Sequence, residues 1–117
     1  MRKIYRYEKL SFKGNPEDDV TFKVKFISDG NIGHTVINIP GDNDPEIANS
    51  GERSLGKLQT LITEKVVSVS DIANPTPEVD EIIVDYFIND TFLVRHSNPK
   101  TETDRPIVIL KIKFTTS

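Results

Sequence analysis

Hydrophobic and polar residues alternate along most of this chain with a period of two. Residues 20–26 place four apolar side chains on one face and three polar ones on the other, and residues 108–114 repeat the pattern. One apolar face and one polar face are typical of a strand in an antiparallel sheet. Strand character also extends over Ile4–Phe12, Thr35–Ile39, Val66–Ile72, Val79–Ile88 and Phe92–His96.

Glycine, asparagine and proline separate these segments, and Asn89-Asp90 predicts a tight hairpin between two of them. The pattern predicts an all-β fold: a single domain over residues 1–117, built as an antiparallel β-sandwich of about seven strands. A partly open β-barrel is the alternative. In strand number and spacing the chain resembles immunoglobulin-like sandwiches, but it lacks their Cys…Trp…Cys signature.

Two segments depart from simple alternation. In Ile4–Phe12 the apolar face changes between Tyr7 and Leu10, which predicts a bulge near Glu8–Lys9. The segment 40–57 is polar and predicts a long loop, suited to carry binding specificity. One short helix is expected near residues 55–63, from apolar residues at helical spacing and Ser54 as a candidate cap.

The alternation also predicts which side chains fill the core between the sheets. These are Phe22, Val24, Phe26, Val84, Tyr86, Leu110 and Ile112.

The composition excludes several classes of protein. The 117 residues include no cysteine, so disulfides, thiolate nucleophiles and cysteine-bearing zinc sites are excluded. No apolar run reaches the length of a membrane span, and the basic N-terminal segment has no apolar leader core. We therefore expect a cytoplasmic protein that does not bind membranes, although export as part of an assembly stays open.

Candidates for catalysis are few. His96 and Ser97 are adjacent, so on a continuous strand they point to opposite faces and cannot form a nucleophile–base pair. The segment 51–56 has one residue too many for a GxSxG nucleophile elbow. A small hydrolase centred on His34 or His96 is the second alternative function. Should their strands pair, the two histidines would meet, with an Asp, as a metal site or acid–base pair.

Asp42, Asp44 and Glu46 place acidic groups at alternate positions of one loop, a chemistry that calcium prefers. The loop loosely resembles the Asp/Asn calcium linkers of cadherin-type sandwiches, but it lacks the glycine and distal glutamate of an EF-hand. A calcium- or carbohydrate-binding module using Asp42–Glu46 is therefore the first alternative function. The competing interpretation is an ordinary solvated loop.

One strand carries more apolar residues than a single buried face requires. Alternation places Ile83, Asp85 and Phe87 on its outward face, with Asp85 expected to be hydrated. Ile83 and Phe87 thus mark a candidate contact surface.

Charge is unevenly distributed along the chain, whose net charge is -3. Residues 1–25 and 95–117 each carry +3, whereas residues 26–94 carry -9. We expect Lys23, Lys25, Lys111 and Lys113, with Arg6, to form one basic face that supports self-association into a ring or a stack. Nucleic-acid binding is not expected, because the chain is acidic overall.

These observations favour a non-catalytic protein–protein interaction or structural module that needs no cofactor. By fold analogy alone, such a domain serves as a subunit or adaptor of a larger assembly, such as a phage-like or secretion apparatus, or as an immunity-type binder.

Overall fold

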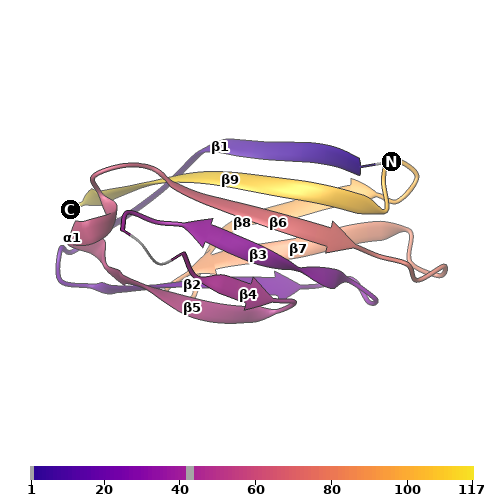
Figure 1. Ribbon diagram of the computed structural model, residues 1–117, viewed down its shortest axis with the longest axis horizontal. Coiled ribbons are helices and arrows are strands. Elements are labelled where there is room, and N and C mark those ends of the chain that lie inside the picture. Colours follow the sequence, from indigo (N-terminus) through magenta and orange to yellow (C-terminus); the bar gives the residue numbers. More distant parts are fainter. Residues whose placement is uncertain (1, 42–43) are drawn as a thin grey trace.

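The computed structural model describes residues 2–41 and 44–117, which fold into two packed β-sheets (Figure 1). Nine strands and one short helix form within this part of the chain: β1 Arg2–Gly14, β2 Asp19–Phe26, β3 Ile32–Asn38, β4 Glu46–Ala48, β5 Gly51–Lys57, α1 Leu58–Leu61, β6 Val66–Ala73, β7 Glu81–Ile88, β8 Thr91–Pro99 and β9 Arg105–Thr116. The five-stranded sheet has the order β1-β9-β6-β3-β4, and the four-stranded sheet has the order β5-β2-β7-β8. The predicted β-sandwich is confirmed, and the barrel alternative is wrong because the sheets stay separate.

The first and last strands, β1 and β9, pair in parallel, whereas the other strand pairs of the described residues are antiparallel. The sequence analysis expected antiparallel pairing throughout. A tight turn makes consecutive strands antiparallel. Because β1 and β9 lie at opposite ends of the chain, no turn sets their relative direction.

The segment 40–57, expected to be a loop, contains the two additional strands β4 and β5. Strand β4 has three residues, and β5 buries a single side chain, that of Leu55. Neither strand therefore shows the alternation that marks a half-buried strand. Both lie at the edge of their sheet, where one side of the strand pairs with no other described strand.

The predicted helix is confirmed as the single turn α1. Leu58 and Leu61 are buried, and the Leu58 backbone N–H donates to the Asp18 carbonyl oxygen at 2.8 Å. The residue at the N-cap is Lys57, without a side-chain cap, so the expectation that Ser54 caps the helix is wrong. Ser54 lies within β5 instead.

The core lies between the sheets and contains six of the seven predicted residues. Phe26, the exception, is half-buried because it ends β2. The core also contains a polar cluster, in which the Ser70 hydroxyl lies 2.7 Å from that of Thr35 and accepts from that of Tyr86 at 2.8 Å. Hydrogen bonding compensates these hydroxyls for their loss of water.

Two local predictions are also confirmed. The register of β1 against β9 shifts between Tyr7 and Leu10, so both residues face the core. Asn89 and Asp90 join β7 to β8 with positive φ angles of 50° and 64°, the backbone that a two-residue hairpin requires. The Asn89 side chain also accepts from the Thr21 backbone N–H at 2.8 Å, which ties the hairpin to β2.

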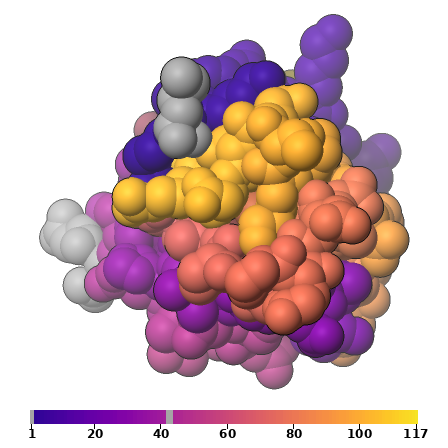
Figure 2. All heavy atoms as spheres, turned by 90° about the vertical axis from the view of Figure 1, so that its right-hand side faces the viewer, coloured from indigo at the N-terminus to yellow at the C-terminus, as the bar shows by residue number. Residues whose placement is uncertain are grey.

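At one end of the long axis of the molecule, loops between strands contact one another. Figure 2 shows the segment 100–106, in gold, lying over the segment 74–80, in coral. Lys100 Nζ donates to the Thr76 carbonyl oxygen at 2.6 Å, and Asn74 Nδ2 donates to the Asp29 carbonyl oxygen at 2.9 Å. Three loops are therefore joined by side-chain hydrogen bonds at this end.

Candidate interaction surface

The residues expected to bind a partner lie on two opposite faces of the sandwich. Lys23 and Lys25 on β2, with Ile83 and Phe87 on β7, occupy the outer face of the four-stranded sheet, where Lys23 is paired with Phe87. Lys111 and Lys113 lie on β9 in the other sheet and alternate with buried residues, so they point to the opposite side. The expectation of one basic face is therefore wrong, because β2 and β9 belong to different sheets.

Phe92 adds an aromatic group that the sequence analysis did not identify as part of the surface. It lies opposite Phe87 across the β7–β8 hairpin, with ring centroids 5.9 Å apart in an edge-to-face arrangement, and it is 55% exposed. The predicted two-residue turn at Asn89-Asp90 could have identified Phe92, because such a turn places Phe92 opposite Phe87 on the neighbouring strand. We call Ile83, Phe87 and Phe92 the apolar strip.

Charged side chains lie beside the apolar strip and within it, since Asp85 lies between Ile83 and Phe87 on the outer face of β7. The Lys23 ammonium lies 5.5 Å from the Phe87 ring centroid, within the range of a cation–π interaction. Arg95 contacts Asp85 through two hydrogen bonds, Nε to Oδ1 at 2.7 Å and Nη2 to Oδ2 at 2.9 Å. These contacts fix the position of Arg95 beside the strip.

Asp85 faces outward as predicted, but the expectation that it is hydrated is wrong. Its exposed fraction is 6%, because Arg95 covers it. The Arg95 hydrogen bonds hold the pKa of the Asp85 carboxyl below its ordinary value, against the opposing effect of burial. The carboxylate therefore stays ionised and serves as an anchor for Arg95.

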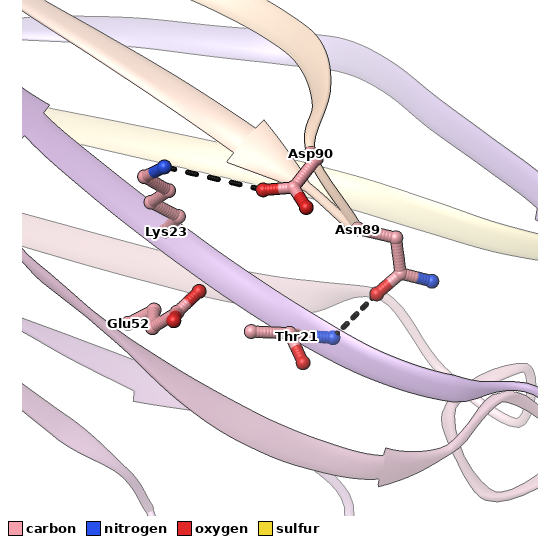
Figure 3. Close-up of a pocket in the computed structure, with 5 residues that line it drawn as sticks. All are labelled: Thr21, Lys23, Glu52, Asn89 and Asp90. Carbon is pink, nitrogen blue, oxygen red and sulfur yellow. Dashed lines mark hydrogen bonds and ion pairs between the residues drawn. The ribbon is translucent and has the colours of Figure 1, made fainter.

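A hollow of about 290 Å³ adjoins the strip and is lined by Thr21, Lys23, Glu52, Asn89 and Asp90 (Figure 3). Lys23 Nζ lies 3.9 Å from Asp90 Oδ1 across it. Its lining combines one cation, two carboxylates, an amide and a hydroxyl, which suits hydrogen bonds to a polar side chain of a partner.

The two histidines do not meet, because β3 and β8 belong to different sheets. His34 is exposed, and its Nε2 lies 3.7 Å from Glu46 Oε1. His96 is buried, with Nδ1 2.9 Å from the Tyr7 hydroxyl and Nε2 2.8 Å from Asn98 Oδ1. Both ring nitrogens of His96 are thus engaged by neighbouring side chains.

The serine candidates are also separated from the histidines. Ser97 is exposed and donates to Glu81 Oε2 at 2.6 Å, whereas the adjacent His96 points into the sandwich, as alternation predicted. Ser54 Oγ accepts from the Gly56 backbone N–H at 3.2 Å, so it makes a local contact within β5.

Of the acidic loop, Asp42 lies outside the described residues. Asp44 Oδ1 accepts from the Ile39 backbone N–H at 3.3 Å, and Glu46 lies on β4 beside His34. Among the residues that the structure describes, no group of three or more His, Asp or Glu side chains is arranged to hold a metal ion.

Comparison with models of known protein families, with curated proteins and with solved structures finds no match to this chain. Within residues 2–41 and 44–117, no helix is long and apolar enough to cross a membrane.

Proposed function

We propose that this protein is a non-catalytic protein–protein interaction module whose binding surface is the outer face of β2, β7 and β8. The observation that carries this proposal is the apolar strip, in which Phe92 is more than half exposed and packs against Phe87 on a rigid sheet. Exposing an aromatic ring costs solvation free energy that a partner's surface recovers.

The side chains around the strip favour a protein as the partner. Protein interfaces are enriched in aromatic residues and arginine at the centre and are polar at the rim. Here Phe87 lies on the inner strand β7, with Phe92 and Arg95 beside it on the edge strand β8, and Lys25 and Glu52 lie on β2 and β5. Nucleic acid requires a predominantly basic surface, whereas acids and bases are mixed on this face.

The anchoring of Arg95 suits this role. A side chain already held by Asp85 loses little conformational entropy when a partner binds, so more of the contact energy contributes to affinity. We propose that the domain acts in the cytoplasm as a subunit or adaptor of a larger assembly.

Site-specific photo-crosslinking tests this function. A photoreactive residue replaces Phe92 in one variant, and Ile62 in a matched control that is 44% exposed and lies at the end of α1. We expect crosslinks to a defined protein from position 92 and not from position 62. The purified partner should then bind the unmodified chain and lose about 10-fold or more affinity on Phe92→Asp.

Equal crosslinking from positions 92 and 62, or an affinity unchanged by Phe92→Asp, would contradict the proposed surface. A crosslink to nucleic acid would replace the protein-binding function altogether.

A further inference from the structure

The outer face of the five-stranded sheet is apolar along its middle, which alternation in the sequence did not bring out. The three inner strands β9, β6 and β3 direct apolar side chains outward, and Val69 at the centre is 39% exposed. The outward apolar residues of these strands are Ile32, Val36, Val67, Val69, Ala73, Ile107 and Ile109. A sheet face in water ordinarily carries polar residues at such positions.

Charges on this face are divided between its two sides. Arg6 on β1, with Lys111 and Lys113 on β9, makes one side basic. Glu46 on β4 lies at the opposite edge. One unbroken row of paired residues crosses the sheet, in the order Arg6, Ile109, Val69, Val36 and Glu46. A cation and a carboxylate therefore end the same row, with three apolar residues between them.

We propose that this face binds the same face of a second copy, about a two-fold axis that runs along β6. The charges select this axis. A two-fold axis perpendicular to the strands would place β1 over β1 of the second copy, so that Arg6 would approach another Arg6. An axis along β6 places β1 over β4 instead, so that Arg6 meets Glu46 twice, as an isologous interface requires.

The same operation matches the apolar residues. Ile109 lies over Val36 of the second copy, and Val69 meets Val69 at the axis. Asp71, also on β6, lies close to Asp71 of the second copy. Each Asp71 already forms an ion pair with Arg2, which supplies the cation that this approach needs.

The short strands of this sheet limit the area of the contact. Five strands at a spacing of about 4.8 Å span about 24 Å across the sheet. About the proposed axis, the three-residue β4 lies over β1 and the seven-residue β3 lies over β9, so β4 and β3 set the length of the overlap. A standard interface buries about 800 Å² on each partner. We therefore expect a dimer that dissociates at low chain concentration.

If the proposed function holds, the dimer presents two binding surfaces. This point rests on the proposed function, whereas the dimer itself does not. The five-stranded sheets meet at the centre, so the two apolar strips of the four-stranded sheets point in opposite directions. One dimer can then bridge two partner molecules, and a partner that itself repeats would be bound with avidity.

Analytical ultracentrifugation of the full chain tests the dimer without any other protein. We expect a dimer whose dissociation constant rises about 100-fold or more on Val69→Lys, because two like charges then meet at the axis. Ile62→Lys is the matched control, since Ile62 is similarly exposed and lies at the end of α1, outside the strands of this sheet. Thermal melting should show both variants folded.

A charge exchange tests the orientation. Arg6 and Glu46 lie four strand spacings apart within one chain, about 19 Å, which exceeds the Debye length of about 8 Å at physiological salt. Arg6→Glu and Glu46→Arg should each weaken the dimer about 10-fold, whereas an equimolar mixture of the two variants should form heterodimers as tight as the wild-type dimer.

A monomer at about 0.5 mM chain, where even a weak millimolar association becomes visible, would overturn the proposal. A dimer that survives Val69→Lys, or a variant mixture that stays monomeric, would do so too. Growth beyond the dimer would indicate the head-to-tail ring or stack instead. None of these outcomes affects the Phe92 crosslinking test, so the two proposals fail separately.

Discussion

The Tyr7 hydroxyl lies 2.9 Å from Nδ1 of His96 and joins the two sheets at the edge where β1 and β8 are the outermost strands. The hydrogen bonds around His96 define its tautomer. Asn98 donates through Nδ2 to the carbonyl oxygens of Pro99 and Thr103, so its Oδ1 accepts from His96 Nε2. In the neutral ring, which burial favours, Nδ1 then accepts from the Tyr7 hydroxyl.

This neutral, buried imidazole predicts a loss of stability in acid. Burial lowers the pKa of His96 below its ordinary value of 6.5, so the unfolded chain binds a proton more readily than the folded chain. The contribution is complete above pH 6.5 and is lost as the pH falls below 6.5 toward the folded pKa. Urea unfolding at pH 7.5 and 5.5 should therefore give a lower free energy of unfolding at pH 5.5.

The variant His96→Gln should remove part of that pH dependence, whereas His34→Gln retains the His96 contribution. Tyr5, Tyr7 and Glu102 surround the His96 ring. Burial and the Glu102 hydrogen bond raise the pKa of Tyr5 to about 12, so it does not titrate in this range. Identical pH dependence in wild type and His96→Gln would show that His96 is protonated without cost.

Two neighbouring core serines predict opposite effects of the same substitution. The buried Ser68 Oγ has no hydrogen-bond partner among the residues that the structure describes, so Ser68→Ala should raise the free energy of unfolding by about 1 kcal/mol. Ser70 contacts the hydroxyls of Thr35 and Tyr86, and Ser70→Ala should lower it by about 1–3 kcal/mol. Urea unfolding measures both, and a shift of both variants in the same direction would contradict the assignment of partners.

The sequence predicted those strands that bury one face and expose the other, because only these show an alternating pattern. Strand β2 alternates between buried and exposed side chains, and its core residues Phe22 and Val24 were predicted correctly. Strand β5 buries Leu55 alone, so no alternation could reveal it. The parallel pairing of β1 with β9 joins residues about 100 positions apart, for which no local turn provides a signal.

The candidate site was predictable to a similar extent. Lys23 and Phe87 were correctly assigned to outward faces, but their pairing depends on the order of strands in the sheet. The same is true of Lys111, which the other sheet carries to the opposite side. The sequence analysis expected Asp85 to be hydrated because it could not identify the contact with Arg95. That contact depends on a register shift in the β7–β8 hairpin.

A side chain at position 33 should clash with the backbone where β3 pairs with β6. A Cβ atom added at Gly33 would lie 2.0 Å from the Asp71 carbonyl oxygen, a backbone atom that a side-chain rotation cannot move. Gly33→Ala should lower the free energy of unfolding by about 2 kcal/mol or more. At Gly51, the nearest atom is a methyl group of Ile47 at 3.1 Å, so Gly51→Ala should cost less than about 1 kcal/mol. Equal thermal melting of the two variants would contradict this packing.

The same truncation at two phenylalanines separates the core from the proposed binding surface. Phe22 is fully buried against Tyr86, with ring centroids 5.9 Å apart, so Phe22→Ala leaves a cavity and should cost about 3–5 kcal/mol. Phe92 is 55% exposed, so Phe92→Ala removes little buried surface and should cost less than about 1 kcal/mol. Urea unfolding gives both values. A loss at Phe92 as large as that at Phe22 would show that the strip stabilises the fold, and Phe92 would then no longer support a partner-binding role.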